Sequence, residues 1–107
     1  MAGSGSYAII ILDGADKDIE QGIDWYETQK TGLGFEFYQA FLTTTHTLAT
    51  SPFLYQEHFL FVRKASLHRF PYSVFYAIDE VNAVVEIIAV FHQRMSPEEL
   101  KHRLNFE

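Results

Sequence analysis

The apolar residues of the chain change their spacing from segment to segment, and each spacing predicts an element. Residues 7–12 read YAIIIL, a short β-branched run that predicts a buried strand. Within residues 15–30, apolar side chains recur every three or four positions and define one helical face: Ala15, Ile19, Ile23 and Tyr26. Either Asp13 or Asp16 is expected to cap this helix by accepting first-turn N–H groups.

A second helical pattern follows a tight break at residues 31–34. Its inward positions again recur at helical spacing: Phe37, Tyr38, Phe41, Leu42, Thr45, Leu48 and Ala49. The pattern ends at Ser51, because the residue before Pro52 avoids the helical region. A connection this short makes the two helices fold back on each other, so we predict an antiparallel helical hairpin.

The second half of the chain predicts strands. Residues 53–61 are expected to pass from loop into strand, and residues 62–68 to form a strand. Residues 72–78 (YSVFYAI) are rich in aromatic and β-branched side chains, which favours a strand strongly. Residues 84–91 (VVEIIAVF) are apolar on both faces apart from one glutamate, so we expect this strand at the centre of the sheet.

A short helix is expected near the end of the chain, with Ser96 as its cap, Pro97 at the first helical position and Glu99 completing a capping box. The predicted order is β-α-α-β-β-β-α. This is an α+β domain, with the helical hairpin packed on one face of a mostly antiparallel four-stranded sheet. Residues 1–6 (MAGSGS) are expected to be a disordered leader, and residues 7–107 a single domain.

Composition excludes several classes of protein. The chain has 107 residues, of which 48% are hydrophobic and 16% aromatic, too apolar for an intrinsically disordered protein. It contains no cysteine, which excludes disulfides, thiolate zinc sites and cysteine nucleophiles. No apolar run approaches the roughly 20 residues that a membrane helix needs. We therefore expect a cytoplasmic protein that does not contact the membrane.

The formal net charge of −6 argues against direct, specific binding to nucleic acid. A local basic excess occurs at residues 51–78, where Arg63, Lys64 and Arg69 outnumber the single acid Glu57. On a strand, Arg63 and Lys64 point to opposite faces and do not form one patch. The basic cluster is either a groove for an acidic partner or an ordinary solvated strand surface.

Candidate chemistry is sparse. The five histidines do not pair at metal-ligand spacing, so we predict no bound metal, and no cofactor motif occurs. His92 and Arg94 follow the strongest strand and would project from one side if the backbone stayed extended. They serve either proton transfer and phosphate binding or a surface contact with the acids of the last helix. Trp25 is either a cover for the core or a binding anchor.

Taken in order, these features resemble the RelE/ParE superfamily of type II toxin–antitoxin toxins. The positions that carry the resemblance are Ala15, Asp18-Ile19, Trp25-Tyr26, Gly32-Leu33-Gly34, Phe37, Ser51-Pro52, Val62-Arg63, Arg69-Phe70-Pro71-Tyr72, Phe75-Tyr76, Ala89-Val90-Phe91-His92-Gln93-Arg94 and Pro97. The resemblance implies a small bacterial toxin of a plasmid-stabilisation module, which inhibits growth. It also implies a cognate antitoxin that neutralises the toxin in a hetero-oligomer.

The superfamily contains two activities. One branch cleaves mRNA on the ribosome, and the ParE branch is associated with poisoning DNA gyrase. The nuclease branch uses several basic residues on its strands and a tyrosine near the C-terminus. Here Lys64 and Arg94 fit two of the basic positions, whereas Ser66 and Ser73 stand at others and no tyrosine follows Tyr76. We therefore favour a ParE-like gyrase inhibitor that is not an enzyme.

Two alternatives remain. A ribosome-dependent mRNA endoribonuclease would use Lys64, His92 and Arg94 as candidate catalytic residues. Met95 and Leu100 stand where relatives often carry a polar residue and a tryptophan, so a non-toxic module that only binds antitoxin is the third reading.

The face of the sheet away from the hairpin is expected to expose aromatic side chains that an antitoxin covers. The expected partner-binding residues are Arg63, Arg69, Tyr72, Tyr76 and Trp25. An amphipathic antitoxin helix is expected in a groove between hairpin and sheet, with Arg63 and Arg69 at its rim facing acidic antitoxin residues.

Overall fold

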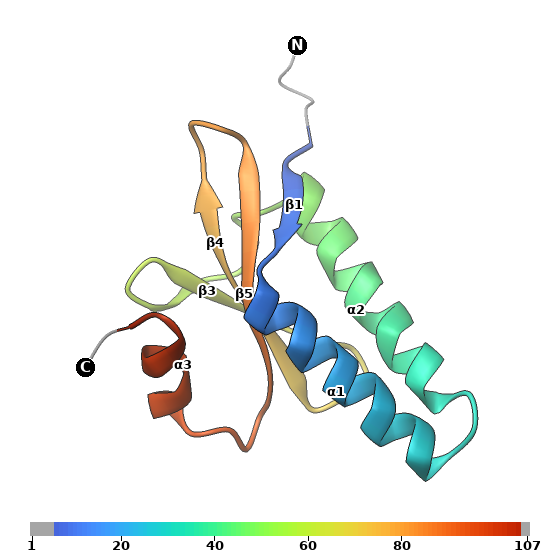
Figure 1. Cartoon of the computed structure of the whole chain (residues 1–107). Helices are drawn as coiled ribbons and strands as arrows, with labels where there is room; N and C mark the ends of the chain where they lie inside the picture. Colours follow the sequence, from blue (N-terminus) through green and yellow to red (C-terminus); the bar gives the residue numbers. More distant parts are fainter. Residues whose placement is uncertain (1–5, 106–107) are drawn as a thin grey trace.

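The computed structural model describes residues 6–105, in which three helices surround a single sheet (Figure 1). Residues 1–5 of the expected leader lie outside the described residues. The elements follow in the order β1 (Ala8–Ile11), α1 (Asp13–Gln29), α2 (Leu33–Thr50), β2 (Glu57–Phe59), β3 (Val62–Ser66), β4 (Tyr72–Asp79), β5 (Val84–His92) and α3 (Pro97–Arg103). None of the helices within residues 6–105 is long and apolar enough to cross a membrane.

The sheet has five strands, in the order β1-β5-β4-β3-β2, one more than predicted. The additional strand is β2, a three-residue edge strand paired antiparallel with β3. Only β1 and β5 are parallel. The α+β class and the helical hairpin on a mostly antiparallel sheet are therefore confirmed, and β5 lies between two partners as its two apolar faces predict.

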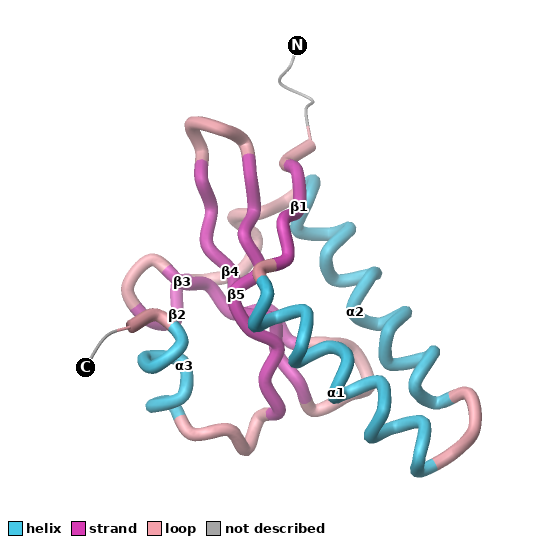
Figure 2. The backbone as a smooth tube through the Cα atoms, in the orientation of Figure 1, coloured by secondary structure: helices cyan, strands magenta, loops and turns pink. Residues whose placement is uncertain are grey.

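The hairpin of α1 and α2 covers one face of the sheet, and α3 lies on the other side (Figure 2). Ala15, Phe37 and Phe41 are fully buried, as the helical spacing predicts. Tyr38 and Leu42, which the spacing also predicts to face inward, are 38% and 37% exposed. The two helices approach closely at Gly22, where a Cβ atom would lie 2.5 Å from the ring of Phe37. The ring of Phe37 packs in turn on Tyr72 of β4, with centroids 4.9 Å apart.

Two local predictions at the start of the chain are wrong. Neither Asp13 nor Asp16 caps α1, because the helix begins earlier and Leu12 stands at the cap without a side-chain hydrogen bond. Both acids lie in the first turn, where the helix dipole favours negative charge. The strand β1 is not buried, since Ile10 and Ile11 are 45% and 39% exposed. It forms the edge of the sheet, with β5 as its only neighbour among residues 6–105.

The face opposite the hairpin is more covered than predicted. Phe75 and Phe91 lie on this face, yet they are only 7% and 5% exposed. They form a second apolar cluster with Val62 and with Leu100 of α3. The short helix therefore acts as a partial lid on a face that the sequence predicts to be open. Ser96 caps it and Pro97 stands at its start, as predicted, with Ser96 Oγ accepting a hydrogen bond from the N–H of Glu98 at 3.2 Å.

Candidate functional site

A single carboxylate, that of Asp18, links α1 to both β5 and α3. Beyond the end of β1, the N–H of Val90 on β5 donates to Asp18 Oδ2 of α1 at 2.9 Å. The two Asp18 oxygens also accept hydrogen bonds from the guanidinium of Arg103 at 3.1 and 3.2 Å. Arg103 further donates to the carbonyl of Ile88 at 3.0 Å and lies over the ring of Phe91. This bidentate ion pair fixes the helix that walls the cavity described next.

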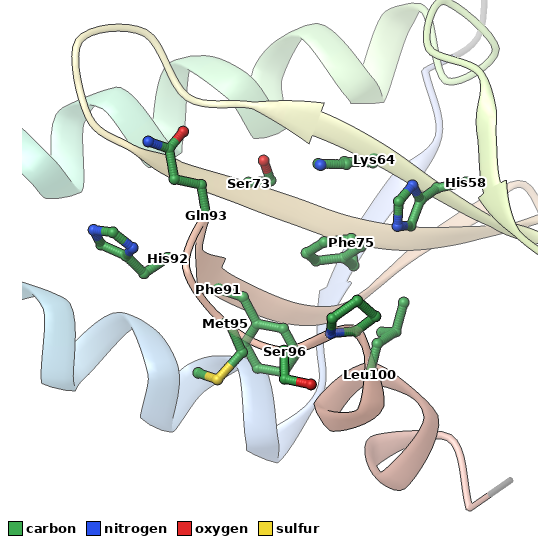
Figure 3. Close-up of a pocket in the computed structure, with 11 residues that line it drawn as sticks. His58, Lys64, Ser73, Phe75, Phe91, His92, Gln93, Met95, Ser96 and Leu100 are labelled. Carbon is green, nitrogen blue, oxygen red and sulfur yellow. The ribbon is translucent and has the colours of Figure 1, made fainter.

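A cavity of about 210 Å³ opens between this helix and the strands β3, β4 and β5 (Figure 3). Apolar side chains from the sheet and from α3 line it, namely Phe75, Phe91, Met95, Pro97 and Leu100. Its polar lining consists of groups that donate hydrogen bonds: His58, Lys64, Ser73, His92, Gln93 and Ser96. No carboxylate lines it within the described part of the chain. In a protein of net charge −6, this lining of donors is chemically suited to an anion.

Among the described residues that line this cavity, Lys64 is the single lysine or arginine. It stands opposite Phe75 in the β3–β4 ladder, and its Nζ lies 5.9 Å from the centre of that ring. The preceding residue, Arg63, points away from the cavity, as strand alternation predicts. The Arg63 guanidinium donates to the carbonyl of Tyr55 at 2.6 Å and lies 3.9 Å from Glu57. The two neighbouring cations therefore do not act on one ligand.

His92 lies where β5 ends, and it lines the cavity. The chain turns immediately after it, and the N–H of Met95 donates back to the carbonyl of His92 at 2.8 Å. The N–H of Arg94 donates to His92 Nδ1 at 2.9 Å, so the neutral ring carries its proton on Nε2. The extended arrangement that would put His92 and Arg94 side by side is therefore absent. Arg94 does not line the cavity, whereas Lys64 and His92 both do.

The remaining predicted partner-binding residues have different surroundings. Arg69 is exposed and forms an ion pair with Glu36 of α2 at 2.8 Å. Tyr76 is fully buried, and its hydroxyl donates to the carbonyl of Pro52 at 2.8 Å. Burial raises the pKa of Tyr76 to about 12, and this side chain offers a partner no surface. The roles of Arg63 and Arg69 in binding a partner stay predictions.

A second cavity, of about 240 Å³, lies between α1 and the end of β5. Trp25 forms part of its wall and is 57% exposed. Tyr72 lines it as well, half-buried, and burial raises the pKa of its hydroxyl. Its lining residues Phe91, His92 and Met95 also line the first cavity, so the turn that begins at His92 separates the two.

The comparisons with known proteins agree with this fold. The family model of the ParE toxin of type II toxin–antitoxin system, parDE, matches residues 9–97. The chain belongs to this family. No curated protein is significantly similar to it in sequence.

Two solved structures share the fold of this ParE-family chain. One is from the chromosomal ParDE toxin–antitoxin system of P. aeruginosa, with a TM-score of 0.71 and 14% identity, covering 81% of this chain and 96% of that one. The other is from the toxin–antitoxin complex RelBE2 of Mycobacterium tuberculosis, with a TM-score of 0.59 and 16% identity, covering 81% of this chain and 98% of that one. The family match over residues 9–97 confirms the resemblance to the RelE/ParE superfamily, and the two structures agree with it in fold.

Sequence reasoning missed two parts of the site. His58, on the additional strand β2, lines the cavity, and no local pattern singles it out. The ion pair between Asp18 and Arg103 joins residues 85 positions apart, a distance over which periodicity carries no signal. Within residues 6–105, no group of three or more His, Asp or Glu side chains is placed to hold a metal ion.

Proposed function

We propose that this ParE-family chain is a toxin that inhibits DNA gyrase by binding it, without catalysis, and that a cognate antitoxin neutralises it. The observation that carries the proposal is the charge of the cavity, where Lys64 is the sole Lys or Arg among the described lining residues. Nearby cations are engaged elsewhere, with Arg63 near Glu57, Arg69 with Glu36 and Arg103 with Asp18.

This charge distribution favours binding to a protein target over cleavage of RNA. Cleavage of a phosphodiester needs several positioned donors around the charge that develops in the transition state. The basic side chains of residues 6–105 that line the cavity are one lysine and two histidines, which is few for stabilising that charge. The net charge of −6 also opposes binding of a polyanion such as mRNA.

An antitoxin partner is supported by the relatives. The two solved structures described above come from toxin–antitoxin systems, and the matching family is described by the same type of system. The exposed apolar side chains of the hairpin fit such a partner, since Trp25 and Phe35 are 57% and 64% exposed.

A gyrase supercoiling assay with the purified chain tests the proposal. We expect the chain to inhibit supercoiling, and the Lys64→Gln variant to inhibit it less. Induction in cells is expected to stall DNA synthesis before protein synthesis. A supercoiling reaction that proceeds normally at a large molar excess of the folded chain would refute gyrase as the target.

The second candidate function is ribosome-dependent mRNA cleavage. It is favoured by one observation, that Lys64, His92 and Gln93 line the same cavity. Primer extension on mRNA from induced cells decides between the two. New 5′ ends positioned by codon, lost in the His92→Gln variant, would establish the nuclease and exclude the binding mechanism.

A further inference from the structure

Two cavities of different chemistry lie on either side of the turn that begins at His92. The first presents Lys64 over the ring of Phe75, together with further hydrogen-bond donors and Phe91. The second presents Trp25 and Tyr72. Because His92, Phe91 and Met95 line both, a ligand that crosses this turn contacts the two cavities together.

We propose that this double cavity binds an extended peptide segment of a protein partner, which places a carboxylate beside Lys64 and a bulky apolar side chain against Trp25. The inference deepens the proposed function and rests on it, since a toxin that acts by binding needs a surface that recognises protein. It assigns to that surface an acidic residue and an apolar residue, a few positions apart in the partner.

The carboxylate half of the proposal rests on the lining of the first cavity. Its donors come from separate strands, with His58 on β2, Lys64 on β3 and Ser73 on β4, so the sheet holds them in place. Ser73 is 4% exposed, and its hydroxyl lies 3.4 Å from that of Ser66. Since no acid lines the cavity in the described residues, a single carboxylate enters without like-charge repulsion.

The apolar half rests on the second cavity. Trp25 and Met95 are 57% and 44% exposed, although both are large and apolar. The carboxylate in this wall, Asp18, is already bound by Arg103 and by the N–H of Val90. An apolar side chain seated here therefore covers exposed aromatic surface, as a tryptophan anchor does in a protein interface.

A peptide fits these observations better than a single-stranded RNA. An RNA strand that spans both cavities carries a phosphate at every nucleotide, whereas among residues 6–105 a single lysine and no arginine line them. The α1 helix that borders the second cavity carries further acids, including Asp16, Glu20 and Asp24. A peptide brings a single negative charge to the cavity that holds the lysine.

Trp25 makes the proposal directly testable, because it is the single tryptophan of the chain. Its fluorescence is measured while capped peptides of one Glu and one Leu, separated by one to four glycines, are added at up to millimolar concentration. At least one spacing is expected to move the emission to shorter wavelength, as the exposed indole becomes covered. A peptide with Ser in place of Leu is expected to leave the emission unchanged.

The charge contact is tested by a mutant cycle. We expect binding to weaken about tenfold when Glu of the peptide is replaced by Gln, and by the same factor in the Lys64→Gln variant. The two changes together should weaken binding no more than either alone, because both remove the same contact. The Lys30→Gln variant, at the far end of α1, removes a matched exposed lysine and should bind within about twofold of the parent chain. Urea unfolding of each variant shows whether it is folded.

Three results would overturn the proposal. They are an unchanged Trp25 emission with every spacing, equal binding of the Glu and Gln peptides, and tighter binding of a short oligouridylate with the same dependence on Lys64. The gyrase assay is read separately. If the chain inhibits gyrase but ignores the peptides, the proposed function stands and this inference fails. If it binds the peptides but leaves gyrase active, this inference stands and gyrase inhibition fails as the proposed function.

Discussion

The carboxylate of Asp18 and the guanidinium of Arg103 lie 3.1 Å apart, although 85 positions separate them in the chain. The contact joins the hairpin on one face of the sheet to α3 on the other, around the end of β1. Asp18 and Arg103 side chains are 14% and 29% exposed, so water screens the pair less than a surface ion pair. The wall of the candidate site thus depends on the first helix.

Replacing Asp18 by Asn should loosen α3. The negative charge and one of the two accepting oxygens are lost while the shape is kept, so the free energy of unfolding should fall by about 1–3 kcal/mol. Urea denaturation measures this loss. The matched control is Glu98→Gln, since Glu98 and Lys101 form an exposed pair 3.9 Å apart, and its effect should stay below about 1 kcal/mol. Equal effects of the two changes would mean that the buried pair contributes no more than the exposed one.

Glu27 caps a helix to which it does not belong. From α1 its carboxylate accepts the N–H groups of Gly32 and Gly34 at 2.9 and 3.0 Å, at the start of α2. The residue at that cap, Gly32, has no side chain to do so. Glu27→Ala should therefore cost about 1 kcal/mol of unfolding free energy, the usual value of a lost cap. Asp24→Ala, at an exposed position of the same helix, is the control, and thermal unfolding that ranks it as the more damaging change would contradict the capping role.

Tyr76 should make the fold sensitive to strong alkali. Burial raises the pKa of its hydroxyl from 10.0 to about 12. Below about pH 10 the phenol is protonated in both the folded and the unfolded chain, and its contribution to the free energy of unfolding is fully present. Between about pH 10 and 12 the unfolded chain releases a proton that the folded chain retains, so the free energy of unfolding falls as pH rises.

The variant Tyr76→Phe isolates this effect. It should lose about 1 kcal/mol at neutral pH, because the carbonyl of Pro52 no longer receives its hydrogen bond. It should also show a shallower fall above pH 10 in urea unfolding followed by circular dichroism. Burial also raises the pKa of Tyr26 and Tyr72, so part of the fall remains. A variant with the same pH slope as the parent chain would contradict the role assigned to Tyr76.

Lys64 and Arg94 should differ in their effect on toxicity. Lys64 lines the cavity and Arg94 does not, although the resemblance to the superfamily makes both of them candidates. In cells that express the chain without antitoxin, Lys64→Gln should raise the expression needed to stop growth by about tenfold, while Arg94→Gln should stay within about twofold. Antitoxin co-purification provides the check that both variants fold. A reversed order would place the functional surface outside the cavity.

Local patterns were enough to predict the helices. The apolar spacing of residues 15–30 predicts α1, which runs from Asp13 to Gln29, and the Ser51-Pro52 pair ends α2 one residue earlier, at Thr50. Ser96 caps α3 as its type and position indicate. These features depend on contacts between residues a few positions apart, and the local sequence is enough to predict such contacts.

The sequence by itself determined the α+β class, the hairpin, the interior position of β5 between two strands and the superfamily. Only the tertiary structure decided that β2 pairs at the edge, that α3 covers Phe75 and Phe91, and that Lys64 and His92 share a cavity without Arg94. The physical reason is the range of the interactions. Strand order, the turn after His92 and the ion pair of Asp18 with Arg103 join residues far apart in the chain, and no periodicity within one segment encodes those contacts.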